Sequence, residues 1–224
     1  MNFNRNFDLN KLFLIITLSI FLTGCGGGNG GSNDASNLTA TLCPGRLSYE
    51  NAGSENILFA SVNSSGVSGW IENQNEIKMP NSDLKPNNAA NTSEITLKSV
   101  PDGIYNLVYY AGSEQLKLQK TISWTTLPDF PTAPSTPAWD SSSQRLTVNF
   151  SGIAAGNVSY YLRLYYGVSP DSMYYQTDKI SGGGTLSMHV GQSGDYTPIL
   201  VADIIENSQT AGTVRYIFST MSLY

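Results

Sequence analysis

Apolar residues recur at every second position along most of the chain after Leu38. In the segment 116–124, for example, Leu116, Leu118 and Ile122 alternate with polar residues. A period of two places such side chains on one face of a β-strand, whereas a helix needs a period near 3.6. No stretch combines a helical period with helix caps. The sequence therefore predicts an all-β fold.

Two features stand out in the first half of the chain. Residues 104–110 and 116–124 are predicted to form a β-hairpin, because the turn at 111–114 is short and contains Gly112. Residues 79–93 are rich in asparagine and proline and interrupt the alternation. This segment is therefore predicted to be a long surface loop, either functional or a variable excursion between two sheets.

A proline-rich segment divides the alternating pattern into two parts. Its prolines recur at every third position, at 128, 131, 134 and 137. This spacing matches the three-residue turn of polyproline II. We therefore expect a stiff linker at about 126–137 that holds two β-sandwich domains apart, the first over 38–127 and the second over 128–224.

The second half contains seven strand candidates at the spacing of a β-sandwich. They are Pro137–Ser141, Arg145–Phe150, Val158–Tyr166, Met173–Ile180, Gly184–Val190, Tyr196–Ile205 and Thr213–Thr220.

The second half resembles a fibronectin type III or related immunoglobulin-like domain. The resemblance rests on 145–150 and 160–166 as second and third strands, and on Gly194-Asp195-Tyr196 before 199–202. It implies that Tyr196 is the tyrosine-corner residue, although Phe150 stands where this family usually has tryptophan. In the first half, Val100-Pro-Asp-Gly-Ile-Tyr105 is a similar signal, with Tyr105 as its corner. The two halves together resemble tandem immunoglobulin-like sandwiches.

The N-terminus has the parts of a secretory signal. Arg5 and Lys11 precede an apolar stretch at 12–22 that is too short to cross a bilayer, which takes roughly 20 residues. The stretch ends in Leu22-Thr23-Gly24-Cys25, which resembles the lipobox of bacterial lipoproteins. An ordinary signal peptide with Cys25 as a bystander is the alternative.

The lipobox resemblance has consequences for location. It implies that residues 1–24 are removed, that Cys25 carries the lipid, and that the protein is anchored on an extracytoplasmic membrane face. Gly26 replaces the aspartate that retains many such proteins in the inner membrane, which favours the outer membrane if the cell has one. Residues 25–37 are rich in glycine and predict a flexible tether.

The chain has 2 cysteines, Cys25 and Cys43. If Cys25 carries the lipid, Cys43 has no partner cysteine, so no disulfide is expected within the chain. Cys43 is expected to be a small buried hydrophobe, with pairing to another chain or thiol reactivity as alternatives. No cofactor other than the covalent lipid is expected.

The charge pattern and the rare histidine argue against several functions. The net charge is −5 and there is no basic cluster, so nucleic acid is not an expected partner. His189 is the single histidine and is expected on an outer strand face. A histidine-based metal site or catalytic triad therefore lacks its usual residues, and we expect a protein that is not an enzyme and binds no metal.

Adjacent tyrosines in the second half suggest a binding surface. If Tyr160, Leu162, Leu164 and Tyr166 face the core, then Tyr161, Arg163 and Tyr165 form an outward stripe, joined by Tyr174 or Tyr175. Tyrosine and arginine are enriched at binding hot spots, but tyrosine also covers sheets that bind nothing.

The predicted function is therefore binding of an envelope protein or glycan by a membrane-anchored bacterial lipoprotein. A structural spacer or accessory subunit of an envelope assembly is the alternative.

Overall fold

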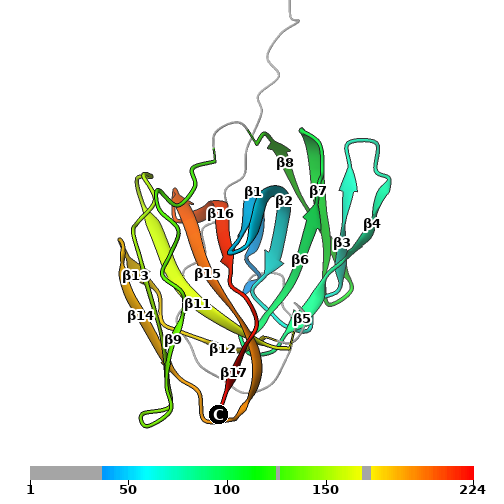
Figure 1. The fold of residues 1–224 in the computed structure, drawn as a ribbon. Coiled ribbons are helices and arrows are strands. Elements are labelled where there is room, and N and C mark those ends of the chain that lie inside the picture. Colours follow the sequence, from blue (N-terminus) through cyan, green and yellow to red (C-terminus); the bar gives the residue numbers. More distant parts are fainter. Residues whose placement is uncertain (1–36, 125–126, 168–172) are drawn as a thin grey trace, which may run out of the picture. The chain divides into compact units, whose positions relative to one another are not determined.

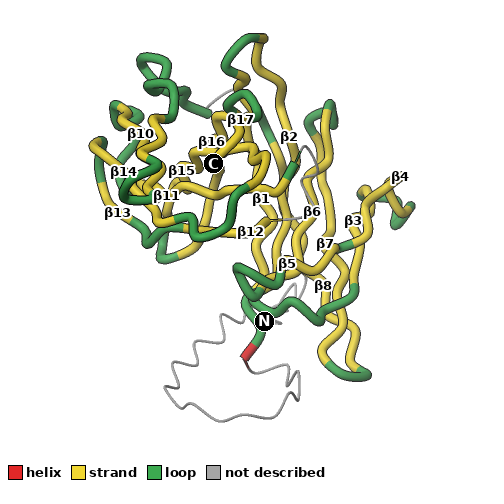
Figure 2. Tube along the Cα trace, turned by 60° about the horizontal axis from the view of Figure 1, so that its bottom comes forward, coloured by secondary structure: helices red, strands yellow, loops and turns green. Residues whose placement is uncertain are grey.

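The computed structural model describes residues 37–124, 127–167 and 173–224, and these ranges form β-strands and no α-helix (Figure 1). The short helical segment drawn in Figure 2 is a 3₁₀ residue, Asn37, at the start of the described chain. The all-β class predicted from the sequence is confirmed. The predicted signal peptide, Cys25 and nearly all of the tether lie outside the described residues.

The strands form three sheets. The largest has 10 strands, and its main path is β12 (Met173–Gln176), β11 (Val158–Tyr166), β15 (Gly194–Glu206), β16 (Gln209–Ile217), β1 (Ala40–Tyr49), β2 (Ala52–Val62), β6 (Thr92–Lys98) and β5 (Lys85–Asn87). Off this path, β13 (Ile180–Ser181) pairs with β11, and β17 (Met221–Leu223) pairs with β15. A second sheet has the order β4 (Lys78–Asp83), β3 (Gly69–Asn73), β7 (Gly103–Ala111) and β8 (Glu114–Ile122). The third has the order β14 (Gly184–His189), β10 (Arg145–Phe150) and β9 (Ala138–Asp140).

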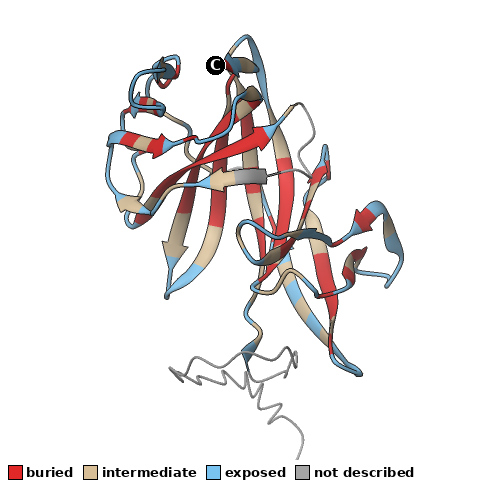
Figure 3. Cartoon of the chain, turned by 90° about the horizontal axis from the view of Figure 1, so that it is seen from below, coloured by how far each residue is buried: buried red, intermediate tan, exposed pale blue. Residues whose placement is uncertain are grey.

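Each half of the chain has its own apolar core on the large sheet. In the first half, Leu58 and Leu97 of the large sheet pack with Ile71 and Leu107 of the four-stranded sheet. In the second half, the core includes Leu162 of the large sheet. The buried segments in Figure 3 follow these strands, whereas the turns are exposed. Alternation in the sequence thus identified the residues that pack between the sheets.

A tyrosine corner stabilises each half, as the resemblance implied. Tyr196 donates a hydrogen bond to the carbonyl oxygen of Gln192 at 3.0 Å, and Tyr105 donates one to that of Pro101 at 2.9 Å. In both cases the acceptor lies four residues upstream, so each ring fixes the chain entering its strand.

The two halves are joined within one sheet by a parallel strand pair. β1 pairs with β16, with Gly45 opposite Thr213 and Tyr49 opposite Ile217. A Cβ atom on Gly45 would lie 2.8 Å from Thr213 Cγ2, so the close approach of these strands favours glycine. The pairing begins directly after Pro44, which has no N–H to contribute to a ladder.

The expectation that a proline linker holds the halves apart is therefore wrong. Segment 127–137 lies against the folded chain: Asp129 accepts hydrogen bonds from Arg46 at 3.5 Å and Ser48 at 3.3 Å. Phe130 packs against the second core. The division of the chain at residue 128 into two domains stays a prediction.

The predicted loop at 79–93 is also wrong in part. Most of it forms β4 and β5, which are edge strands with mostly polar side chains, followed by a turn. Proline is tolerated at the edge of a sheet, so Pro80 and Pro86 do not prevent strand formation there. The predicted hairpin at 104–124 is confirmed, with Gly112 at φ 61° in its turn.

Candidate functional site

The face of the large sheet that is turned away from both smaller sheets carries the candidate site, and we call it the inner face. Its register is continuous across the join: Tyr161 lies opposite Val201, Val201 opposite Arg215, and Arg215 opposite Leu47. In the first half, Phe59 lies opposite Thr96. Residues directly opposite one another share a face, so both halves contribute to the inner face.

A bidentate ion pair crosses the inner face. Arg163 of β11 donates to Glu94 of β6 through Nη1 at 2.8 Å and Nη2 at 3.0 Å. These strands are five places apart in the sheet, which is about 24 Å for a flat sheet. The sheet must therefore curl so that its two halves face each other across the inner face.

The side chains of the predicted stripe, Tyr161, Arg163 and Tyr165, point away from the second core as expected, but the expectation that they are exposed is wrong. Tyr160, Leu162 and Leu164 lie in the second core, so their neighbours point the other way. However, Tyr161, Arg163 and Tyr165 are only 4%, 5% and 5% exposed. The curl of the sheet brings the first half over them, and alternation along one strand cannot show what covers its outer face.

The other two predicted tyrosines do not join the stripe. Tyr175 packs against the second core, opposite Leu164, with its ring centroid 6.4 Å from that of Tyr196. Tyr174 belongs to β12, but its side chain lies outside what the structure describes.

Glu94 and Arg163 are both charged in this arrangement. Burial alone would raise the pKa of Glu94, but the charge and hydrogen bonds of Arg163, with the charge of Arg215, outweigh it and lower the pKa. The pKa of Arg163 is raised: burial would lower it, but interactions with Tyr161 and Glu94 outweigh this. The pair is thus a buried salt bridge between the halves.

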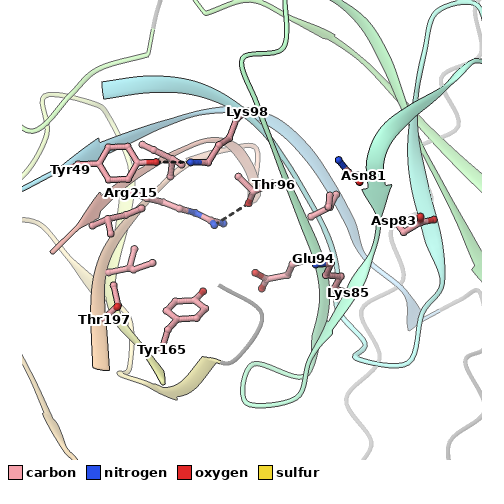
Figure 4. Close-up of a pocket in the computed structure, with 14 residues that line it drawn as sticks. Tyr49, Asn81, Asp83, Lys85, Glu94, Thr96, Lys98, Tyr165, Thr197 and Arg215 are labelled. Carbon is pink, nitrogen blue, oxygen red and sulfur yellow. Dashed lines mark hydrogen bonds between the residues drawn. The ribbon is translucent and has the colours of Figure 1, made fainter. Parts of the chain in front are cut away.

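A cavity of about 650 Å³ lies beside this ion pair on the inner face (Figure 4). Known ligand pockets have volumes of about 300 to 1,000 Å³, so the cavity is large enough for a small organic ligand. Its walls are Leu47, Tyr49, Asn81, Asp83, Lys85, Glu94, Ile95, Thr96, Lys98, Tyr165, Thr197, Ile199, Arg215 and Ile217. The last five of these residues come from the second half and the other nine from the first, so both halves enclose the cavity.

The polar groups at one side of the cavity are linked to each other. Lys98 donates to Tyr49 Oη at 2.7 Å and to Glu55 Oε1 at 2.7 Å, and Tyr49 also donates to Glu55. On the same side Arg215 donates to Thr96 Oγ1 at 3.3 Å, as Figure 4 shows. These contacts present aromatic, hydroxyl and cationic groups to one ligand-sized space.

Cys43 and His189 lie where the sequence predicted. Cys43 is fully buried, and burial raises the pKa of its thiol to about 12, so the thiol is neutral at physiological pH. His189 is exposed on β14 and does not line the cavity.

Sequence reasoning missed most of the cavity, including Arg215, Glu94 and Thr96. The available signal was that each of two otherwise apolar strands, 160–166 and 213–218, contains one arginine, Arg163 in the first and Arg215 in the second. Arg163 was expected on an outward stripe, because nothing local shows that its strand faces the first half.

Among the described residues, no group of three or more acidic, histidine or cysteine side chains is arranged to hold a metal ion. The part of the chain that the structure describes also contains no helix long and apolar enough to cross a membrane.

No family model matches this chain, and no curated protein matches it significantly. Solved structures with similar folds include a cytokine receptor complex, with 12% identity over 83% of this chain and 95% of that chain and a TM-score of 0.30. A titin fragment shares 8% identity over 83% of this chain and 66% of its own, with a TM-score of 0.32. The BSP domain structure of a biofilm-associated protein shares 11% identity over 85% of this chain and 30% of its own, with a TM-score of 0.30.

Proposed function

We propose that this chain is a non-catalytic binding protein, anchored by lipid at the bacterial cell envelope, that takes a protein or glycan ligand into the cavity on its inner face. The observation that carries this proposal is the cavity itself, which both halves enclose. The cavity has the volume of a ligand pocket, and apolar side chains such as Leu47 and Ile199 line it together with polar and charged groups that can orient a ligand.

The chemistry of the walls supports binding over catalysis. No histidine or cysteine is among the lining residues. The carboxylate of Glu94 is held by Arg163, and the hydroxyl of Thr96 accepts from Arg215. Neither arrangement pairs a nucleophile with a base, whereas both present fixed hydrogen-bonding groups to a ligand.

Binding at the cavity is testable by filling it. Ile217→Trp adds a large side chain at a half-buried cavity wall, and we expect at least a tenfold loss of affinity for any ligand found on an array of bacterial surface glycans. Ile77→Trp is the matched control because Ile77 is 61% exposed and lines no part of the cavity. Equal binding by both variants would contradict the cavity assignment. A wild-type protein that binds no glycan or envelope protein would favour the structural spacer.

The anchor is testable independently of the ligand. Cys25→Ser is expected to leave an uncleaved or soluble precursor, because the serine hydroxyl does not replace the thiol that receives the lipid. Mass spectrometry of the mature N-terminus checks this. A wild-type chain that starts at any residue other than an acylated Cys25 removes the argument for membrane location.

A further inference from the structure

Arg215 lines the cavity and is a buried cation, two of whose guanidinium nitrogens have no hydrogen-bond partner. It is 7% exposed, and its guanidinium carbon lies 4.2 Å from the centroid of the Phe59 ring. Nη1 donates to Thr96 at 3.3 Å, whereas Nε and Nη2 have no hydrogen-bond partner. Most buried polar groups are hydrogen-bonded, so two unpartnered nitrogens on one guanidinium require an explanation.

Nearby acidic side chains are held by other partners. Both oxygens of Glu94 accept from Arg163. Asp203 accepts from Tyr161 at 3.0 Å and from Thr213 at 3.0 Å. Within the described ranges, no carboxylate forms an ion pair with Arg215, so its charge has no direct counter-ion.

An unpaired buried charge is unfavourable, and a protein that retains one at a cavity wall gains if a ligand supplies the opposite charge. Resting on the function proposed above, we propose that Arg215 binds the carboxylate of a small acidic ligand, of the class of sugar acids. A carboxylate matches the two-pronged geometry of a guanidinium. Nε and Nη2 are covered in the structure, so binding requires the guanidinium to turn toward the cavity and give up the long bond to Thr96.

The rest of the cavity favours a single negative charge on a hydroxylated ligand. Glu94 and Asp83 line the cavity beside Lys85, Lys98 and Arg215, so two acidic and three cationic side chains leave a net charge of +1, which one carboxylate balances and a dianion such as phosphate exceeds. Asn81 and Thr197 place an amide and a hydroxyl in the walls, and the aromatic ring of Tyr165, although mostly buried, forms part of the wall (Figure 4). Ile199 contributes an apolar wall.

Sodium glucuronate is the probe, and glucose at matched ionic strength is its uncharged control. We expect glucuronate to raise the urea concentration at the midpoint of unfolding of the wild-type protein, and glucose to leave it unchanged, because only glucuronate has a carboxylate that can pair with Arg215. In Arg215→Met the response to glucuronate is lost, and calorimetric titration shows at least a tenfold weaker affinity. Arg215→Lys keeps the charge and retains a reduced response.

Stability without ligand separates this role from a structural one. Removing a buried charge that has no direct ion pair leaves Arg215→Met at least as stable as the wild type in sodium chloride, whereas an arginine that only supports the fold would make the variant less stable. A lower midpoint for Arg215→Met, or a glucuronate response that persists in it, overturns the proposal. If glucose and glucuronate stabilise the protein equally, the role of Arg215 in binding a carboxylate is overturned, whereas the proposal that the cavity binds a ligand stands. A larger response to inorganic phosphate overturns the assignment to a carboxylate.

Discussion

Arg163→Ala is expected to lower the free energy of unfolding by about 3 to 5 kcal/mol, because it leaves the carboxylate of Glu94 buried without its partner. The side chains of Arg163 and Glu94 are only 5% and 14% exposed. Urea unfolding of the wild type and the variant measures the difference. Lys78→Ala is the control: it breaks the pair between Lys78 and Asp83, whose side chains are 49% and 66% exposed, and should change stability by less than about 1 kcal/mol.

The same ion pair makes stability depend on pH. The pKa of Glu94 is lower in the folded chain than its unfolded value of about 4.3. Its stabilising contribution is therefore complete above that value and is lost as the pH falls through the lower folded pKa. The difference in stability between wild type and Arg163→Ala should shrink below about pH 4. A difference that stays constant into stronger acid would show that Glu94 is not the partner that matters.

Separate expression of residues 37–127 and 128–224 is expected to give two proteins that are each less stable than the joined chain. Each fragment keeps its own core, but it loses the pairing of β1 with β16 and the contacts across the inner face. Ala90 would no longer pack against the cluster around Tyr161, and Ile217 would leave the cluster around Phe59. The exposed strand edges would also favour aggregation.

Urea unfolding of the two fragments beside the chain 37–224 checks this expectation. Fragments that each unfold cooperatively at the midpoint of the joined chain would show that the halves are independent domains, as the proline-rich segment suggested. Lower midpoints, or a fragment without a cooperative transition, would support one joined structure.

Local sequence patterns predicted the strands and the direction of their side chains. The strands 145–150 and 158–166 have the predicted bounds, and Tyr105 and Tyr196 form the predicted corners. Each of these features depends on residues close together in the chain. A period of two shows which residues share a face of a strand, and a tyrosine corner spans only five residues.

The candidate site depends on contacts between residues far apart in the sequence, and these were not predictable. The pairing of Gly45 with Thr213 joins strands at opposite ends of the folded chain. The alternating pattern correctly predicted that Tyr161 and Arg163 point away from the second core. However, these side chains are buried by the curl of the large sheet, and that sheet includes both halves only because β1 pairs with β16.

Unfolding observed separately from each half tests most directly whether the two halves form one structure around the cavity. The chain has 3 tryptophans, two in the first half and Trp139 in the second. Trp139→Phe leaves fluorescence that reports on the first half, and the double change Trp70→Phe and Trp124→Phe leaves fluorescence that reports on the second. If the halves are joined through the shared sheet, both variants give urea transitions that coincide with the loss of β-structure measured by circular dichroism. Two separated transitions, with the midpoint of neither affected by Arg163→Ala, would contradict a shared inner face and the site built on it.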